Sequence, residues 1–205
     1  MSGPRLSGIV VVAVALLCVA ACAKRPTVQQ PAIHEGVIDL REWDFDRSGP
    51  VSLRGTWAFY RDQLVSDPSA LSKGPDGFVR APSSWNGQTI AGEPLKAYGA
   101  HSYLVRLVVP ADLIRPTLYF RDQKSAYRVY ANGQLLASNG QVGTGAENTR
   151  PFYRPQVVEL PADISNTPKN ETRGYRTIVL VVQVANFHDR KGASSFRFSL
   201  VRKPR

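Results

Sequence analysis

A tryptophan and an asparagine stand side by side in the segment Pro82-Ser83-Ser84-Trp85-Asn86. Sugars present flat apolar C–H faces and rings of hydroxyl groups, so a sugar site usually combines an aromatic ring with amides, carboxylates or guanidinium groups in a concave place. Trp85 and Asn86 offer both kinds of group on one loop. The alternative is structural, because tryptophan is often a core residue: Trp85 then closes the end of the fold and Asn86 caps a turn.

A second polar group begins at Asn186, directly after a strongly apolar extended run. Loops held by a rigid sheet are where binding residues collect, so we predict that Asn186, His188 and Arg190 contact a ligand. A structural role is equally compatible with these residues. In that case Asn186 closes the turn on its own backbone, Phe187 packs inward, and Asp189 forms an ion pair with Arg190.

Two more polar side chains belong to the same predicted set. Arg128 lies in an extended run, and Asn139 opens a glycine-rich segment that reaches Gly145. This segment follows a predicted hairpin strand and precedes no helix, whereas a phosphate loop of the dinucleotide type opens a helix, so no phosphate cradle is expected there. The predicted ligand contacts are Trp85, Asn86, Arg128, Asn139, Asn186, His188 and Arg190.

The sequence gives little support for catalysis. It contains no Gly-x-Ser-x-Gly or His-Glu-x-x-His motif, and His34, His101 and His188 are far apart without metal-ligand spacing. Asp44 and Asp46 could share one face of a strand, as a glycosidase acid pair would require. Their aromatic neighbours favour a strand end with carboxylates in water. We expect no enzyme activity, no cofactor and no metal site.

An apolar run from Ile9 to Ala23 includes the sequence Val19-Ala20-Ala21-Cys22, which has the form of a bacterial lipoprotein processing site. The run is roughly 15 residues long, fewer than the roughly 17 to 25 that cross a bilayer as a helix. Small residues before the cysteine let a processing peptidase approach the backbone, and the thiol of Cys22 can then carry lipid. The alternatives are an ordinary secretory signal and a transmembrane anchor.

The expected organisation is a lipoprotein signal over residues 1–21, a lipidated cysteine and flexible tether over residues 22–32, and one folded domain over residues 33–205. The chain would be anchored in the bacterial envelope by membrane lipid at Cys22. Ala23 lacks the acidic side chain that favours inner-membrane retention in enteric bacteria, so we expect the outer membrane, facing the periplasm. The folded domain has no cysteine of its own, which excludes disulfides.

The formal net charge is +10. An exported protein does not meet nucleic acid, so we expect no nucleic-acid partner. The basic residues are scattered, which favours a solvated surface compatible with anionic lipid or wall polymer over a dedicated polyanion site.

Short extended runs separated by proline and glycine dominate the remaining sequence. Ser102–Pro110 and Ile178–Ala185 are apolar on much of both faces and rich in β-branched residues, which predicts central strands. Asn132-Gly133 separates two extended runs and predicts a hairpin, because both turn residues must accept positive φ. Further strands are expected at Val37–Leu40, Thr56–Tyr60, Thr117–Phe120, Val157–Leu160 and Phe196–Val201.

Helical periodicity is almost absent beyond the signal, and only Asp62–Leu71 could hold one or two turns. Many short strands around a common core predict an all-β fold, a jelly-roll β-sandwich.

Four segments in order along the chain resemble the sugar-binding jelly-roll domain of family 2 glycoside hydrolases: Leu53–Tyr60, Ala81–Asn86, Ala100–Arg106 and Ala126–Gly133. That resemblance implies a galactose-binding-like fold. It concerns the sugar-binding domain and not the barrel that carries the catalytic carboxylates of those enzymes.

Three other segments resemble the extracellular sensor domain of bacterial seven-transmembrane receptors with diverse intracellular signalling modules: Ser138–Thr144, Tyr153–Pro155 and Gln183–Gly192. In such receptors the chain continues into membrane helices, whereas this sequence stops at Arg205. The resemblance therefore implies a sensor-like domain that binds a carbohydrate and signals through a separate membrane-bound kinase or cyclase.

The alternative is a protein-interaction or structural module of the envelope without a small ligand. It predicts that Trp85 and the loop from Asn186 to Gly192 are satisfied internally, with an exposed apolar patch elsewhere.

Overall fold

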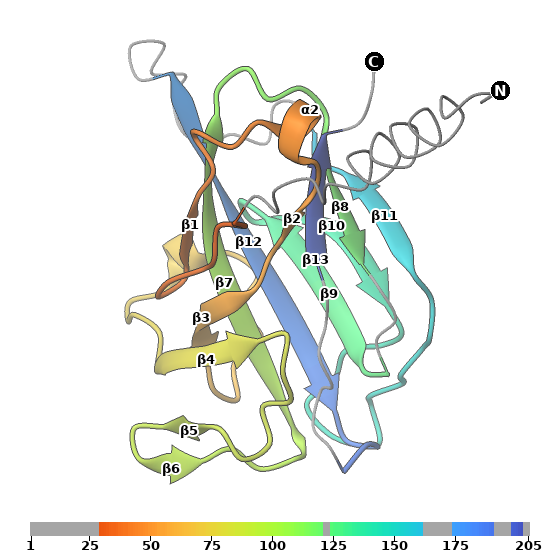
Figure 1. Ribbon diagram of the computed structural model, residues 1–205. Helices are drawn as coiled ribbons and strands as arrows, with labels where there is room; N and C mark the ends of the chain where they lie inside the picture. Colours follow the sequence, from red (N-terminus) through yellow and green to blue (C-terminus); the bar gives the residue numbers. More distant parts are fainter. Residues whose placement is uncertain (1–28, 121–123, 162–173, 191–197, 203–205) are drawn as a thin grey trace, which may run out of the picture.

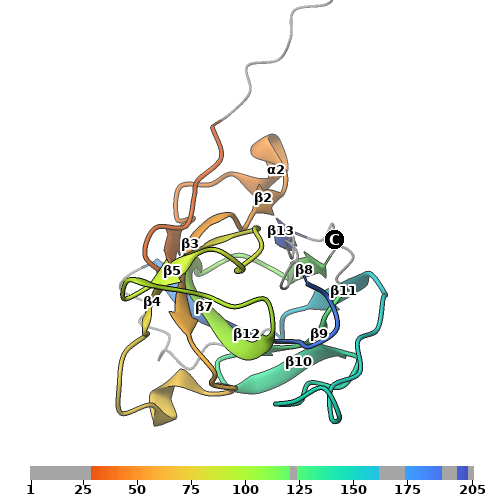
Figure 2. The same ribbon diagram turned by 90° about the horizontal axis from the view of Figure 1, so that it is seen from below.

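The computed structural model describes residues 29–120, 124–161, 174–190 and 198–202. The predicted signal and Cys22 lie outside these residues. The described chain forms two main sheets that pack face to face, with a one-turn helix at one end and a small hairpin at the other (Figures 1 and 2). This confirms the all-β jelly-roll sandwich.

The larger sheet has the strand order β10-β9-β12-β7-β3-β4, and β1 pairs in parallel with β7 beyond the end of β3. Its strands are β1 (Val37–Asp39), β3 (Gly55–Tyr60), β4 (Gly77–Ala81), β7 (Gly99–Pro110), β9 (Ala126–Ala131), β10 (Gln134–Asn139) and β12 (Tyr175–Asn186).

The smaller sheet has the order β11-β8-β13-β2, and a separate hairpin joins β5 to β6. The strands are β2 (Val51–Ser52), β5 (Thr89–Ile90), β6 (Glu93–Pro94), β8 (Pro116–Phe120), β11 (Gln156–Glu159) and β13 (Phe198–Arg202). The sequence did not predict the short strands β2, β5 and β6, nor β4.

The predicted central strands are confirmed, because β7 and β12 pair antiparallel over their full lengths, from Tyr175 opposite Pro110 to Asn186 opposite Gly99. Alternate β7 side chains such as Tyr103 fill the core between the sheets. The outer face is covered as well: Leu104 is fully buried and belongs to a cluster with Val65. Apolar content on both faces of β7 follows from this double cover.

The predicted hairpin at Asn132-Gly133 joins β9 to β10, and both turn residues have positive φ, 46° and 82°. The Asn132 side chain also accepts a hydrogen bond from the Val179 backbone N–H at 2.8 Å. The turn is therefore tied to the neighbouring strand β12.

The strand end expected around Asp44 and Asp46 is wrong. The chain forms a one-turn helix, α2 (Phe45–Ser48), because the Asp44 carboxylate accepts hydrogen bonds from the backbone N–H groups of Asp46 and Arg47 as an N-cap. Phe45 faces the core, and the exposed Asp46 carboxylate pairs with Arg202.

The Asp62–Leu71 segment contains only a short 3₁₀ helix, Pro68–Ala70. Within the described part of the chain, no helix has the length and apolar character needed to cross a membrane.

Candidate functional site

The structure brings most of the predicted ligand contacts to one end of the sandwich, at the bottom of Figure 1. At this end β12 finishes at Asn186 opposite Gly99, where β7 begins, and β10 finishes at Asn139 opposite Tyr127 near the start of β9. The Asn86 side-chain N–H donates to the carbonyl of Arg190 at 3.3 Å. The two loops singled out from the sequence are therefore in direct contact.

Trp85 takes the structural role of the alternative interpretation. Its side chain is fully buried, and the indole N–H donates to the Lys96 carbonyl at 2.8 Å. The ring packs at a near-right angle on the His101 imidazole, with 4.6 Å between ring centroids. No face of this indole is open to a ligand.

Asn186 is also buried, and its amide is used within the fold. The side-chain N–H₂ donates to the carbonyls of Ala97 at 2.9 Å and Asp189 at 2.7 Å, and the side-chain oxygen accepts from the Asp189 N–H at 3.1 Å. The residue closes its own turn and ties it to the segment before β7. The half-buried Phe187 packs against an apolar cluster, as the structural alternative expects.

The other predicted contacts differ in how far their side chains are buried. The buried Asn139 donates to the Phe152 carbonyl at 2.6 Å, and Arg128 lies half-buried on β9 opposite Gln183 of β12. A ring nitrogen of His188 lies 3.1 Å from the Thr149 carbonyl. The predicted contacts whose side chains are exposed are Asn86, His188 and Arg190.

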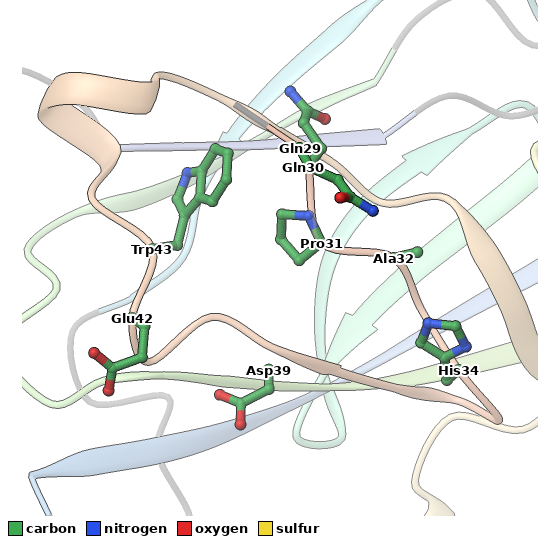
Figure 3. A pocket seen from close by; sticks show the side chains of 8 residues that line it. All are labelled: Gln29, Gln30, Pro31, Ala32, His34, Asp39, Glu42 and Trp43. Atoms are coloured by element: carbon green, nitrogen blue, oxygen red, sulfur yellow. The ribbon is translucent and has the colours of Figure 1, made fainter. Parts of the chain in front are cut away.

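A groove lies at the opposite end of the sandwich, between the segment 29–34 and the connection from β1 to α2 (Figure 3). Its volume is about 480 Å³. Trp43 and Glu42 form one side, the N-terminal segment forms the other, and Asp39 lies between them. The lining residues are Gln29, Gln30, Pro31, Ala32, His34, Asp39, Glu42 and Trp43.

Two hydrogen bonds fix the N-terminal wall of the groove. The Gln30 side-chain N–H₂ donates to the Pro50 carbonyl at 3.0 Å, and its oxygen accepts from the Ser52 N–H at 3.0 Å. An amide side chain can imitate a strand partner in this way, so Gln30 attaches the segment to β2.

The opposite wall holds a tryptophan in a fixed orientation. The Trp43 indole N–H donates to the Gly49 carbonyl at 3.0 Å, and the half-buried ring packs against the main core while also bordering the groove. An aromatic ring held in this way can offer apolar surface without a large loss of side-chain entropy.

The groove is acidic. The Arg41 side chain hydrogen-bonds Asp39 at 2.9 and 3.0 Å, and this contact holds the pKa of the Asp39 carboxyl below its usual value. Glu42 is exposed beside it. Both Asp39 oxygens already accept hydrogen bonds from Arg41, whereas Glu42 forms no ion pair with another described residue. The Glu42 carboxylate is therefore the acceptor that suits a ligand rich in hydroxyl donors. Within the described residues, no three His, Cys, Asp or Glu side chains are grouped as metal ligands.

Sequence reasoning missed this groove, although a signal was present. Trp43 follows Glu42 and precedes Asp44, which is the same pairing of an aromatic with a polar acceptor that drew attention to Trp85. The partner wall comes from residues 29–34, most of which lie in the predicted tether of residues 22–32.

A smaller hollow of about 240 Å³ lies at the loop end, bordered by Asp62, Tyr98 and His101 among others. The Asp62 backbone N–H donates to His101 Nδ1 at 3.0 Å, which places the proton of the neutral ring on Nε2. Burial lowers the pKa of His101 to about 4. The ring is therefore neutral at physiological pH.

No family model and no curated protein matches the chain. Among solved structures, the fold is similar to part of several β-glucuronidases. The Faecalibacterium prausnitzii enzyme matches with 24% identity over 68% of this chain and 21% of that chain, at a TM-score of 0.45. The β-glucuronidase from an uncultured Clostridium sp. matches with 18% identity over 75% of this chain and 29% of that chain, at a TM-score of 0.49.

The Bifidobacterium dentium β-glucuronidase complexed with coumarin-3-O-glucuronide matches with 17% identity over 75% of this chain and 30% of that chain, at a TM-score of 0.48. The chain thus spans less than a third of the length of each of these three enzymes.

Proposed function

We propose that this protein binds a carbohydrate or a similar polar small ligand in the groove between residues 29–34 and the β1–α2 connection. The observation that carries the proposal is the half-buried Trp43 ring, held beside the Asp39 and Glu42 carboxylates in a cavity of about 480 Å³. Small-ligand sites have volumes of about 300 to 1,000 Å³ and combine apolar surface with a few placed polar groups.

The chemistry of the two walls is complementary to a sugar. The indole can pack against the apolar C–H face of a ring, and the Glu42 carboxylate can accept hydrogen bonds from its hydroxyl groups. Hydrogen bonds to ionised groups are stronger than those between neutral groups. The site therefore favours a neutral, hydroxyl-rich ligand over an anionic one.

The groove also suggests how binding could be sensed. One wall belongs to the segment 29–34, which includes the last four residues of the predicted tether, 29–32. In the proposed arrangement Cys22 carries lipid in the envelope, with the outer membrane facing the periplasm as the expected location, and a ligand contacts the chain close to its anchor. Binding would then alter the segment 29–34, and a separate membrane-bound kinase or cyclase would respond to its altered position.

One observation favours the alternative of a protein-interaction module. Val157 of β11 and Tyr119 of β8 are cross-strand partners with exposed side chains, 66% and 39% accessible, and Phe152 and Tyr153 before β11 are 56% and 59% accessible. Neighbouring exposed apolar side chains of this kind can form an interaction surface. Trp85 and Asn186 are satisfied internally, which the same alternative expects.

The test is a titration of the full chain with neutral mono- and oligosaccharides, wall fragments and nucleotides. Trp57 and Trp85 are fully buried and Trp43 is not, so a ligand in the groove should change mainly the fluorescence of Trp43. A ligand present at about 100 times its dissociation constant should also stabilise the fold by about 2.7 kcal/mol.

Glu42→Gln should weaken binding by about tenfold, because it removes a charged acceptor while keeping the side-chain size. Glu147→Gln is the matched control, since Glu147 is an exposed acid outside the lining of the groove. Equal affinities of the two variants would contradict the proposed site. No binding across the panel, with co-purification of a membrane protein that is lost in Val157→Asp, would favour the interaction module.

A further inference from the structure

A second hollow lies on the other side of the N-terminal segment, with a volume of about 580 Å³. It shares Ala32 and His34 with the proposed sugar groove, and apart from Ile33 its other lining residues lie around the start of β3 and the end of β4. Its lining residues are Ala32, Ile33, His34, Arg54, Gly55, Thr56, Arg80, Ala81 and Pro82.

Strand register places the polar lining residues on one face. Ile33 forms a parallel bridge with Gly55, and Gly55 is opposite Ala81, while Ile33 and Ala81 are buried toward the core. Successive side chains of extended segments point to opposite faces. The flanking residues His34, Arg54, Thr56 and Arg80 therefore face outward together.

The three segments approach closely because position 55 is glycine. A Cβ at this position would lie 2.0 Å from the Ile33 carbonyl oxygen. The Ile33 N–H donates to the Arg54 carbonyl at 2.7 Å, and the Thr56 N–H donates to the Ile33 carbonyl at 2.8 Å. The backbone on both sides of Arg54 is thus held by the N-terminal segment.

The charges of this hollow are unbalanced. Arg54 and Arg80 are exposed, and neither guanidinium forms an ion pair with another described residue. The lining residues include no carboxylate. Thr56 is directly opposite Arg80, and Arg54 precedes β3 by one residue, so the two basic side chains lie on neighbouring segments of the same face.

We propose that this hollow is a binding site for an oxyanion, a phosphate or carboxylate group held between Arg54 and Arg80. Guanidinium groups match the geometry of these anions and can bind them through two parallel hydrogen bonds. The site is separate from the acidic groove and has the opposite charge. The same group could come from an anionic lipid headgroup or from a soluble anion.

The test uses the full chain and two probes, inorganic phosphate and vesicles of phosphatidylcholine with or without phosphatidylglycerol. Arg54→Gln combined with Arg80→Gln should weaken binding by at least about tenfold. Arg47→Gln combined with Arg154→Gln is the control, because it removes the same charge from exposed arginines outside the hollow. The N-terminal apolar run is the same in both variants, so any vesicle binding through that run is equal in the two proteins.

Loss of phosphate binding in the Arg54/Arg80 variant alone supports a soluble anion as the ligand. Loss of only the phosphatidylglycerol-dependent vesicle binding in that variant supports a lipid headgroup. Absence of binding to both probes, or equal weakening by the control variant, overturns the proposal. Glu42→Gln should leave anion binding intact, so failure of the sugar site and failure of the anion site are distinguishable.

Discussion

His101 is a buried titratable side chain held by specific contacts. Its ring packs between Phe59 and Trp85, and Nδ1 accepts the Asp62 N–H. Its Nε2 is buried and has no hydrogen-bond partner among the described residues. Burial disfavours the charged ring and lowers the pKa of His101 to about 4, although the Asp62 carboxylate opposes this effect.

This pKa predicts a pH-dependent stability. In the unfolded chain, His101 becomes protonated near pH 6.5, whereas in the folded protein it stays neutral down to about pH 4. The unfolded state therefore binds more protons between these values. The free energy of unfolding should fall by about 3 kcal/mol as the pH decreases from 6.5 to 4, in addition to the effect of other groups.

Urea unfolding at pH 7, 5.5 and 4 measures this dependence. His101→Gln keeps an acceptor for the Asp62 N–H and should flatten the profile. His34→Gln, at an exposed histidine, should leave the wild-type slope unchanged. A slope that is the same in all three proteins would show that His101 does not cause it.

At the scale of elements, the N-terminal segment connects several parts of the fold. It joins β3 through Ile33, β1 through the bridge between His34 and Val37, and β2 through the Gln30 amide. It borders both the acidic groove and the basic hollow. Its position depends on the close approach at Gly55, whose φ is 138°.

Gly55→Ala should therefore displace the segment from β3. The added Cβ meets the Ile33 backbone, and φ at this position disfavours other residues. We expect the free energy of unfolding to decrease by about 2 to 4 kcal/mol, because buried Ile33 and two backbone hydrogen bonds are disturbed.

Urea unfolding checks this expectation, with Gly74→Ala as the control. A Cβ at Gly74 meets nothing within 4 Å, so this variant should change stability by less than about 0.5 kcal/mol. Similar stabilities for the two variants would mean that the close contact at Gly55 is not maintained in solution.

At the scale of the whole molecule, one core connects the two sheets. The main apolar cluster includes Trp57 and Tyr103 of the larger sheet together with Leu118 and Leu200 of the smaller one. The buried polar contacts of Trp85 and Asn186 close the loop end, whereas the two proposed binding sites lie along the N-terminal segment. The proposed ligands would thus bind next to the predicted membrane tether.

Expression in a bacterium that processes lipoproteins, with a radiolabelled fatty acid in the medium, tests the proposed lipid anchor. A radiolabelled fatty acid should be incorporated into the wild-type chain and lost in Cys22→Ala, because only the cysteine at the processing site supplies the thiol. Cys18→Ala is the matched control and should keep the label. Equal labelling of wild type and Cys22→Ala would contradict the anchor.

Much of the fold could be predicted from local patterns. The β-branched runs that became β7 and β12 are apolar on both faces, and Asn132-Gly133 satisfies a turn that requires positive φ. The strands β2, β5 and β6 were missed because a strand of two residues shows no alternation that distinguishes it from a loop. The five-residue strand β4 was missed as well. The helix α2 was missed because the Asp44 side chain caps the backbone N–H groups of Asp46 and Arg47, which stabilises a helical turn where a strand end was expected.

Local sequence patterns specify the central strands of the sandwich and place the loops of Trp85 and Asn186 at strand ends, because alternation and turn chemistry act over a few residues. Whether Trp43 or Trp85 is buried depends on contacts between distant segments of the fold. Trp85 meets the Lys96 carbonyl and Asn186 meets the Ala97 carbonyl, which lies 89 positions away in the chain. Trp43 instead borders a groove completed by residues 29–34. Burial depends on such long-range contacts, which no local pattern encodes.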